Sequence, residues 1–424
     1  MGRRKLGLNV LYLVQAIFTF VAALQIWHYT SLNALVRRFK MMKRGPFSSL
    51  NQAFDMVYVK NADTSLEKLL SVDKQLRTYN ITYKVMRATT GSNTAVAAMY
   101  DEYRKRPLGK LQVFPEYSDR EVSRGYHLME SAASFGYIYT MLDVLADAQK
   151  NKFKKILVLD DDILLCNDFQ DRVGAFFSTI GPNWRILQLG ASQYDWTSVD
   201  ETWAMKNGYY QPRLFHTYGS FALGLDRSIF EEVATIARSL ESPFDMLPLG
   251  NMYERYIGQC YVAFPNLFIA DVRQSMIRGH RDQVIHSQRM KWRLHDFPFP
   301  PPRPTIGLIL HSSKLFNVPQ DVFDDHSIDN NGPFILNLYC SSTMDGIRPL
   351  YDLARECNGL ETPGIECASS LTSDFLAIIH KESLPIGYDD ITYYLRTYMD
   401  PTLPKSKVLK PLAPNQNCES QRTW

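Results

Sequence analysis

Residues 154–165, Lys-Lys-Ile-Leu-Val-Leu-Asp-Asp-Asp-Ile-Leu-Leu, constrain the fold of this chain more than any other stretch. A short apolar run bounded by charge favours a buried parallel strand over a helix. Open α/β sheets bind their ligands at the carboxyl ends of such strands, which is where Asp160, Asp161 and Asp162 stand. At about 6 Å and an effective dielectric constant of about 20, two carboxylates repel each other by about 3 kcal/mol. We therefore expect a hard cation, Mn²⁺ or Mg²⁺, beside them, with a solvated acidic turn as the alternative.

The composition is that of a globular protein, since 45% of the 424 residues are hydrophobic and 21% are charged. This length suits one large domain with a smaller one, or two to three domains. A net charge of +3, with Lys and Arg scattered along the chain, argues against a nucleic-acid-binding protein. The six cysteines are too few for a disulfide scaffold and match no zinc motif, and pairing among Cys340, Cys357 and Cys367 stays open.

The N-terminal region predicts a membrane anchor. Residues 1–5 include Arg3, Arg4 and Lys5, and residues 6–27 carry no formal charge over a length that crosses the hydrocarbon layer. The basic flank predicts a cytosolic tail at 1–5, a transmembrane signal anchor at 6–27 and a lumenal body, although basic residues at 37–44 weaken that orientation. A cleaved signal peptide is the alternative. We expect a single-pass type II membrane protein of the Golgi, or of the endoplasmic reticulum, and the glycosylation sequon Asn80-Ile81-Thr82 fits a lumenal body.

A polar stem at 28–52 precedes a series of strands and helices. A strand, a helix and a second strand at 54–59, 64–76 and 83–86 form the opening of a layered α/β domain, which should span 53–290. Residues 92–122 are polar and irregular, and we expect a loop over the site. The remaining expected elements are a helix at 126–148, strands at 184–190, 218–225 and 261–270, and an amphipathic helix at 228–240.

The composition changes in the last third of the chain. Prolines within 291–304 predict an extended linker. The C-terminal accessory region, 305–424, carries no catalytic signature. Its expected elements are strands at 305–310 and 334–339 and helices at 347–357 and 389–398.

Several short motifs occur in a fixed order between residues 53 and 290. They are Val57-Tyr58-Val59 with Asn61-Ala62-Asp63, the stretch 87–91, the strand that ends in Asp160-Asp161-Asp162, the stretch 184–190 and Pro243-Phe244-Asp245. In this order they resemble the family 25 glycosyltransferases, the group that includes bacterial lipopolysaccharide galactosyltransferases and collagen galactosyltransferases. Two features depart from that family. Thr90 replaces an acidic residue, and the Gly-Glu-x-Gly-Cys-x-x-Ser-His element before the long helix is missing.

The resemblance implies a GT-A-like, Rossmann-type α/β fold. It also implies an inverting, metal-dependent transfer of galactose or glucose from a UDP-sugar to a glycan, protein or lipid. It implies Asp162 as the direct Mn²⁺ or Mg²⁺ ligand and Asp160 as its partner through ribose or water. His280 would be a third ligand, with His286 as the alternative. Either residue could instead be an ordinary surface histidine. The residues that would bind the nucleotide sugar are Asn61, Asp63, Asp160, Asp161 and Gly190.

Inversion requires a general base for the acceptor hydroxyl, and Asp245 is the candidate, with Glu254 in reserve. The alternative for Asp245 is a turn cap after Pro243. Other residues suit the substrate by type but also suit ordinary surface or core positions. These are Arg278 and Arg281 for phosphate, and Tyr194 and Trp196 for stacking on a sugar or base.

Two other functional classes remain open. The nucleophile strand of haloacid dehalogenase-type phosphatases also ends in Asp-x-Asp, but Leu164 stands where those enzymes have Thr or Val, and that motif usually opens their domain. The second class is a transferase fold that serves as a catalytically inactive lumenal binding or scaffolding module, which the missing Ser-His element keeps open.

Overall fold

The computed structural model describes residues 50–302 except 276 and 278, and the segments 305–311, 335–339, 375–380, 388–399 and 409–411. The predicted tail at 1–5, the anchor at 6–27 and nearly all of the stem at 28–52 lie outside the described residues. Among the described residues, no helix is both long enough and apolar enough to cross a membrane.

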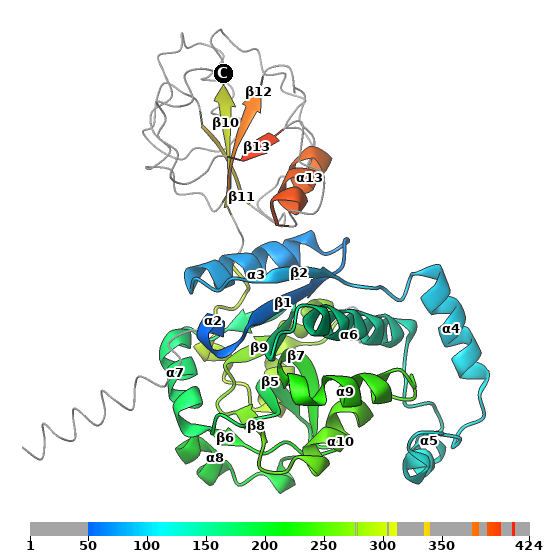
Figure 1. Ribbon diagram of the computed structural model, residues 1–424. Coiled ribbons are helices and arrows are strands. Elements are labelled where there is room, and N and C mark those ends of the chain that lie inside the picture. The colour runs from blue at the N-terminus through cyan, green and yellow to red at the C-terminus, as the bar shows by residue number, and fades with distance from the viewer. Residues whose placement is uncertain are drawn as a thin grey trace, which may run out of the picture.

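A seven-stranded sheet forms the centre of the main body (Figure 1). Its order is β2-β1-β3-β7-β5-β8-β6. The strands β2, β1, β3, β5 and β8 run parallel to one another, whereas β7 and β6 run antiparallel to their neighbours. The carboxyl ends of β1, β3 and β5 therefore meet the beginning of β7 at one edge. The strand bounds are β1 Met56–Asn61, β2 Lys84–Arg87, β3 Lys155–Asp160, β5 Ile186–Gln193, β6 Tyr209–Tyr210, β7 Thr217–Asp226 and β8 Cys260–Ala263.

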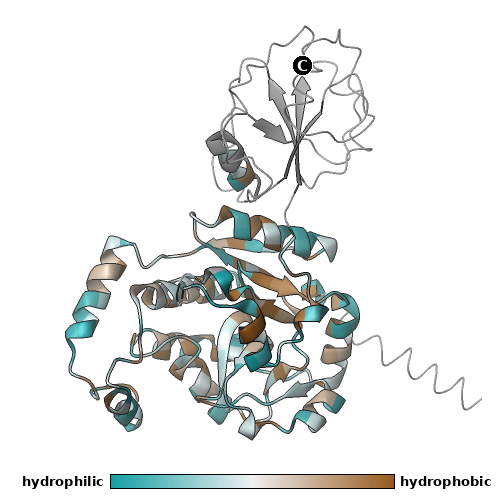
Figure 2. Ribbon diagram, turned by 180° about the vertical axis from the view of Figure 1, so that it is seen from behind, coloured by the Kyte–Doolittle hydropathy of each residue, from teal (hydrophilic) through white to brown (hydrophobic). Residues whose placement is uncertain are grey.

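Helices cover both faces of this sheet, which gives three layers (Figures 1 and 2). The core on one face includes residues of α2 (Leu50–Ala53), α3 (Leu66–Thr78) and α7 (Phe169–Thr179). The core on the other face includes residues of α6 (Ala132–Lys150), α9 (Phe230–Ala237) and α10 (Leu247–Arg255). Figure 2 shows hydrophobic strands between helices whose outer turns are hydrophilic. The mixed α/β architecture expected from the sequence is confirmed.

Strand β3 is buried on both faces, as its apolar run predicts. Leu157 and Leu159 pack with the α3 and α7 layer, whereas Ile156 and Val158 pack with the α6 layer. All four side chains are fully buried. Burial of each contributes about 1.5–3 kcal/mol relative to exposure, which fixes the strand and so the position of the carboxylates that follow it.

The carboxylate triplet ends β3 and leads into a small second sheet. There β4 (Ile163–Leu165) pairs antiparallel with β9 (Phe268–Ala270). The amide of Asp271, just after β9, donates to the carbonyl of Asp162 at 2.6 Å. The expectation of one strand over 261–270 is wrong, because β8 and β9 belong to different sheets. The segment between them contains Pro265, which has no amide to give to a ladder.

The expectation of an irregular loop at 92–122 is wrong. This segment contains α4 (Thr94–Lys105), η1 (Pro115–Tyr117) and most of α5 (Ser118–Arg124). The side chain of Asn93 caps α4 by accepting from the amides of Ala95 and Val96. The helix expected at 126–148 begins later, at Ala132, after an N-cap at Ser131. The remaining elements of the body are α8 (Glu201–Asn207), α11 (Gln283–Met290), η2 (Trp196–Ser198), η3 (Arg227–Ile229), η4 (Val272–Gln274) and η5 (Leu294–Asp296).

The predicted linker at 291–304 packs on the body as far as the structure describes it. Trp292 and Phe297 are buried in its core, and the Trp292 indole donates to the carbonyl of Ala191 at 2.8 Å. Beyond it a four-stranded sheet has the order β11-β10-β12-β13. Its first three strands are parallel, β13 is antiparallel to β12, and α13 (Tyr388–Met399) follows β12 in the chain.

This second sheet confirms the strands expected at 305–310 and 334–339 and the helix expected at 389–398. The helix expected at 347–357 and Cys340, Cys357 and Cys367 lie outside the described residues. The strand bounds are β10 Thr305–His311, β11 Ile335–Tyr339, β12 Phe375–His380 and β13 Leu409–Pro411.

Candidate active site

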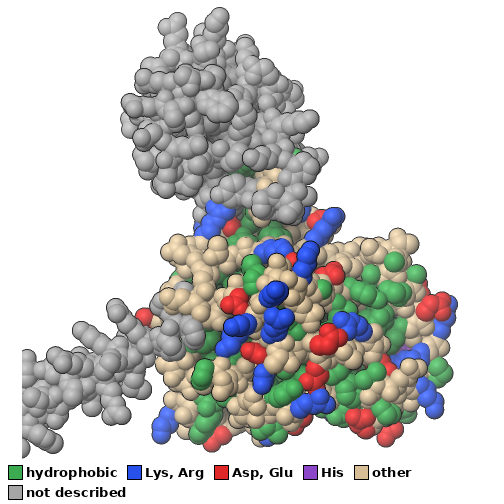
Figure 3. Space-filling model, in the orientation of Figure 1, with side chains coloured by type: hydrophobic (Ala, Val, Ile, Leu, Met, Phe, Trp, Pro, Cys, Tyr) green, Lys and Arg blue, Asp and Glu red, His purple; other side chains and the backbone are tan. Residues whose placement is uncertain are grey.

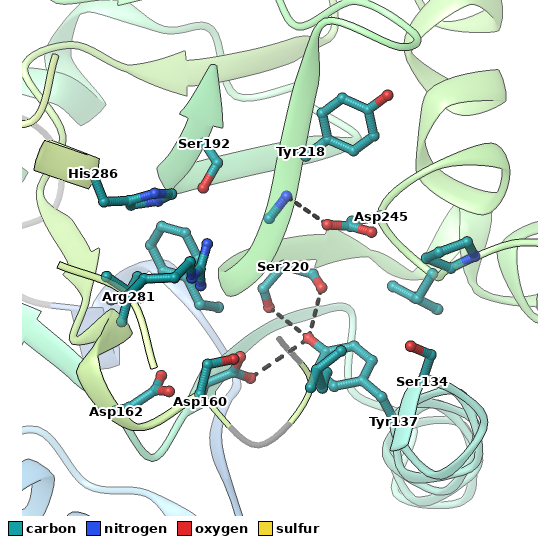
Figure 4. Close-up of a pocket in the computed structure, with 18 of the residues that line it drawn as sticks. Ser134, Tyr137, Asp160, Asp162, Ser192, Tyr218, Ser220, Asp245, Arg281 and His286 are labelled. Carbon is teal, nitrogen blue, oxygen red and sulfur yellow. Dashed lines mark hydrogen bonds between the residues drawn. The ribbon is translucent and has the colours of Figure 1, made fainter. Parts of the chain in front are cut away.

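A cavity of about 140 Å³ opens where β3 ends and β7 begins. Asp160 and Asp162 line it, as do Ser220 and Asp245 (Figure 4). Tyr137, from the N-terminal part of α6, reaches into the same space. Figure 4 shows the two aspartates of the triplet at one end of the cavity and Asp245 at the other, with Ser220 and Tyr137 between them. Asp160, Asp162 and Asp245, which the sequence singled out separately, therefore line the same cavity.

Asp160 is the best-partnered member of the triplet. Its Oδ1 lies 2.6 Å from the ammonium of Lys60, which is on the neighbouring strand β1. The hydroxyl of Tyr137 donates weakly to the same oxygen at 3.5 Å, and it lies 2.6 Å from the hydroxyl oxygen of Ser220. Burial, and secondly the charge of Asp160, raise the pKa of Tyr137 well above its ordinary value, so this hydroxyl stays protonated as a donor.

Asp161 faces away from this cavity, as alternation along a strand predicts. Its carboxylate accepts a hydrogen bond from the side-chain amide of Asn61 at 2.6 Å. Burial raises the pKa of Asp161 to about 6, while Lys68 and the Asn61 amide act in the opposite direction. Asn61 itself is held by a bond from its amide to the carbonyl of Ser65 at 2.8 Å. Asn61 thus orients Asp161, but it lines neither cavity, and its binding to a nucleotide sugar stays a prediction.

Asp162 differs from its two neighbours. Its Oδ1 is buried, and among the described residues it has no hydrogen-bond partner. Burial raises the pKa of Asp162 well above its ordinary value, and the charges of Asp160 and Asp161 raise it further. A buried carboxylate oxygen without a partner is destabilised as an anion, and a bound cation would relieve that. The donor set therefore fits a hard cation held by Asp162 and Asp160.

The protein supplies few ligands for such a cation. In the part of the chain that the structure describes, no group of three or more His, Cys, Asp or Glu side chains is arranged to hold a metal ion. His280 lies outside both cavities and its Nδ1 is 2.6 Å from the carbonyl oxygen of Arg273. His286, the alternative ligand, is buried, lines the first cavity and packs edge-on against Trp292. Mg²⁺ commonly binds one or two carboxylates and takes its other ligands from phosphates and water.

A second cavity, of about 150 Å³, lies on the other side of the triplet. Asp160, Asp161, Asp162 and Tyr137 line it together with Lys60. Most of the remaining wall comes from α3, the turn after β2 and α6, and consists of Lys68, residues 88–91, Ala133 and Thr140. Ala62, Ser275 and Ile277 complete it. Asp160, Asp162 and Tyr137 thus lie in the wall that the two cavities share, whereas Asp161 lines only the second of these two.

Close packing fixes the turn after β2 against α6. A Cβ atom on Gly136 would lie 2.3 Å from the carbonyl oxygen of Thr89, and one on Gly91 would lie 2.5 Å from the amide nitrogen of Ala133. The amide of Thr89 also donates to the hydroxyl of Thr140 at 2.9 Å. These contacts hold the wall of the second cavity at the N-terminal end of a 19-residue helix.

Asp245 is held by the backbone of β7. Its Oδ2 accepts from the amide of Gly219 at 2.8 Å. The carbonyl of Gly219 accepts from Gln188 Nε2 at 2.8 Å, and the same nitrogen donates to the hydroxyl of Tyr253 at 2.7 Å. Glu254, the reserve base, lies at neither cavity and accepts from the amide of Leu214 at 3.2 Å.

The other residues singled out in the sequence separate into those at the site and those elsewhere. Tyr194 and Arg281 line the first cavity. Trp196 packs instead against Tyr210 and Phe264 in a separate core cluster. Asp63 lies beyond the end of β1 and pairs with Arg87, outside both cavities. Arg278 is outside the described residues.

Gly190 serves close packing of the backbone. A Cβ atom there would lie 2.2 Å from the carbonyl oxygen of Phe268, so this position in β5 admits β9 rather than a ligand. It lines neither cavity. The absence of a side chain therefore positions the small β4–β9 sheet, and through it the triplet.

Sequence reasoning missed several residues of the site, among them Lys60, Tyr137 and Ser220. Lys60 had a usable signal, because a lysine inside an apolar strand run requires a partner for its charge. Tyr137 and Ser220 had none, because an aromatic residue in an amphipathic helix and a serine in a strand are ordinary at such positions. Charges outside the site are mixed, and Figure 3 shows basic and acidic side chains interspersed on the face it presents.

No protein-family model matches the sequence, and no relative was found among curated proteins. Among solved structures, the chain is similar to a glycosyltransferase involved in the glycosylation of the major capsid of PBCV-1, with a TM-score of 0.30, 11% identity, and coverage of 56% of this chain and 98% of that chain. It is also similar to the glycosyltransferase GlyE of Streptococcus pneumoniae TIGR4, with a TM-score of 0.26, 10% identity and coverage of 76% and 85%. A third is a mannose-1-phosphate geranyltransferase from Thermus thermophilus, with a TM-score of 0.20, 10% identity and coverage of 72% and 96%. These values assign the chain to no family.

Proposed function

We propose that this protein is a glycosyltransferase that moves galactose or glucose from a UDP-sugar to a hydroxyl of a glycan, protein or lipid. The observation that carries the proposal is one shared site. Asp160 and Asp162, at the carboxyl end of β3, line the same cavity as Asp245, and Asp162 has a buried oxygen without a partner among the described residues. Such a site can hold a cation for an anionic leaving group at one end and a base for a nucleophile at the other.

The second cavity suits the nucleotide part of the donor. It combines the three carboxylates of the triplet with two lysines, Lys60 on β1 and Lys68 on α3. It lies at the carboxyl ends of parallel strands, where α/β sheets bind nucleotides. Ala133, in the first turn of α6, also lines it. The N-terminal end of a helix favours phosphate oxygens, because its free amides and its dipole both attract negative charge.

Asp162 and Asp160 would hold Mn²⁺ or Mg²⁺, and the ion would neutralise the diphosphate leaving group as a Lewis acid. The contribution of the chain is to bring these two carboxylates to one cavity and to keep Asp161 directed elsewhere. The bond from the Asp271 amide to the carbonyl of Asp162 fixes the backbone at this point.

Asp245 would accept the proton of the acceptor hydroxyl, which makes the transfer inverting when attack comes from the face opposite the leaving group. Its carboxylate is already oriented by the Gly219 amide. Tyr194 lines the cavity and would supply an aromatic contact for a sugar ring. A type II membrane anchor at residues 6–27 and a Golgi or endoplasmic reticulum lumen for the body belong to the same proposal.

The test is a titration of the purified full chain in detergent with UDP-galactose and UDP-glucose, with and without Mn²⁺. Thermal stability reports binding, and release of UDP reports turnover. We expect one UDP-sugar to stabilise the protein only with Mn²⁺, and Asp162→Ala to abolish this effect. The Asp195→Ala variant is a matched control, because Asp195 is an aspartate of the same body outside both cavities. If neither UDP-sugar stabilises a folded wild-type protein, the enzymatic proposal is wrong and the scaffold alternative is favoured.

A further inference from the structure

Lys60 occupies a position that an ordinary surface lysine would not. It lies near the end of β1, with β2 on one side and β3 on the other, and its Cα is in register with that of Asp160. Its side chain is 4% exposed. A lysine is almost never buried to this degree unless its charge is paired. The neighbours of its ammonium therefore explain why it is there.

The ammonium of Lys60 lies between an aromatic ring and a carboxylate. Its Nζ is 2.6 Å from Asp160 Oδ1 and 3.5 Å from the centre of the Tyr137 ring. Burial lowers the pKa of Lys60, while the charge of Asp160 and, after it, those of Asp161 and Asp162 act in the opposite direction. Cation–π contact and ion pairing together hold a positive charge inside the triplet.

The three carboxylates differ in what the protein provides for them. Asp160 has Lys60, and Asp161 has the Asn61 amide at 2.6 Å. Asp162 retains a buried oxygen without a partner among the described residues. The protein thus already neutralises one end of the triplet and leaves the other end to an external cation.

We infer that Lys60 is a resident cation of the triplet that competes with a divalent metal ion for Asp160. This deepens the proposed function, because it concerns the metal site of the same centre. With Lys60 in place, Asp162 is the one triplet carboxylate free to bind the metal strongly. Metal affinity in the absence of a nucleotide is therefore weak, and the diphosphate of the donor must supply the missing ligands. Lys60 acts as a positioning residue that makes metal binding depend on the donor.

The test measures Mn²⁺ binding to the full chain in detergent without any nucleotide, from the loss of the free-ion electron paramagnetic resonance signal. We expect Lys60→Met to bind Mn²⁺ about tenfold or more tightly than wild type, because Asp160 is then released to the metal; tenfold corresponds to about 1.4 kcal/mol. Lys60→Gln should shift affinity in the same direction, and it provides the measurement if the methionine variant does not fold. Lys155→Met is the matched control, because Lys155 is a lysine at the beginning of β3, the strand that ends at Asp160, and it lies at neither cavity. It should leave Mn²⁺ affinity unchanged.

The Lys60→Met/Asp160→Asn double variant tests whether the gain passes through Asp160, and it should return Mn²⁺ affinity to the wild-type value or below. The inference is overturned if the Lys60 variants bind Mn²⁺ no more tightly than wild type, if no form binds it, or if the double variant keeps the gain. Turnover of UDP-sugar by wild type is measured separately. Tighter binding by the Lys60 variants without any wild-type turnover leaves this inference standing and overturns the proposed function. Turnover by wild type, without tighter Mn²⁺ binding by the Lys60 variants, overturns this inference and leaves the proposed function standing.

Discussion

The carboxylate of Asp245 accepts a hydrogen bond from the amide of Gly219 at 2.8 Å, so the first residues of β7 orient this side chain before any substrate binds. Gly219 has a φ of 90° and is itself held by Gln188, which is fully buried in β5. The same Gln188 nitrogen bonds to Tyr253 of α10. Three elements of the fold thus converge on one carboxylate, which is the kind of support that a catalytic group needs to act at a fixed geometry.

We expect Asp245→Asn to abolish most of the sugar transfer while the protein stays folded. An asparagine oxygen can still accept from the Gly219 amide, but it cannot take a proton from the acceptor. Loss of a general base lowers the rate by about 10²–10⁴-fold. The measurement is kcat for transfer, with the melting temperature beside it.

Glu254→Gln is the matched control for that experiment. Glu254 was the reserve base, but its carboxylate lies outside both cavities, where it binds the Leu214 amide and Arg213. We expect its transfer rate to stay within about twofold of wild type, since exposed substitutions rarely disturb a distant site. If Glu254→Gln lost transfer while Asp245→Asn kept it, Glu254 would be the general base and Asp245 would not.

Gly136→Ala should destabilise the protein by about 1–3 kcal/mol. The new Cβ would lie 2.3 Å from the carbonyl oxygen of Thr89, so α6 and the turn after β2 must move apart. The cost of this clash outweighs the stabilisation of about 1 kcal/mol that alanine usually brings to a helix interior relative to glycine. Urea unfolding measures the difference in free energy.

Gly181→Ala is the control, because a Cβ there meets no atom of the described residues within 4 Å. It should change the free energy of unfolding by no more than about 0.5 kcal/mol. Equal stabilities for the two variants would mean that the turn adapts freely, contrary to the packing observed.

The apolar run before the triplet predicted β3 well, because alternate residues pack on opposite helical layers and nothing else satisfies that pattern. The prediction for the segment 92–122 was wrong because its helices bury few apolar side chains. In α4 only Val96 is buried, so no apolar stripe marks the helix. The beginning of α4 is fixed by the Asn93 cap, and Glu121 in α5 is buried through ionic and amide contacts. Polar contacts of this kind leave no periodic signal in a sequence.

The candidate site was predicted where one short motif places the side chain, as for Asp160 and Asp162 at the end of β3 and for Asp245 in the turn before α10. The site could not be predicted where the path of a loop determines which side chain reaches the cavity. The chain turns after η4, which leaves His280 against the Arg273 carbonyl, while His286 in the next helix reaches the cavity. Spacing along the sequence carries no information on that choice. Lys60 depends on the register between β1 and β3, which only the folded sheet defines.

Glu121→Gln should lower the free energy of unfolding by about 3 kcal/mol at pH 7, the usual effect of removing one member of a buried ion pair. Glu121 is fully buried and accepts from Arg106 at 2.6 Å and from the Leu128 amide at 3.1 Å. Burial acts to raise the pKa of Glu121, but the Leu128 amide and Arg106 outweigh it, so the pKa is lowered.

The sign of the pH dependence follows from that direction. A carboxylate whose pKa is lower in the folded protein stabilises it fully above the unfolded value of 4.5, and this stabilisation is lost as the pH falls through the folded value. The difference in free energy of unfolding between wild type and Glu121→Gln should therefore become smaller as the pH falls below about 4.5. Glu102→Gln, at an exposed pair with Lys105, should show no such trend. A gap that is constant between pH 3 and pH 7, roughly the range over which carboxylates titrate, would contradict the assignment.

Tyr194 and Trp196 should separate into a substrate contact and a core residue. Tyr194 lines the first cavity, so Tyr194→Ala should raise KM for the acceptor with little change in melting temperature; loss of one sugar–aromatic contact weakens binding by about 1 kcal/mol, or roughly fivefold. Trp196 packs on Tyr210 and Phe264, so Trp196→Ala should lower stability by about 3 kcal/mol and leave KM of the folded fraction near wild type. Kinetics at a temperature below both melting transitions, together with urea unfolding, distinguish the two effects. If Tyr194→Ala changes stability alone, the aromatic wall of this cavity is structural and the acceptor binds elsewhere.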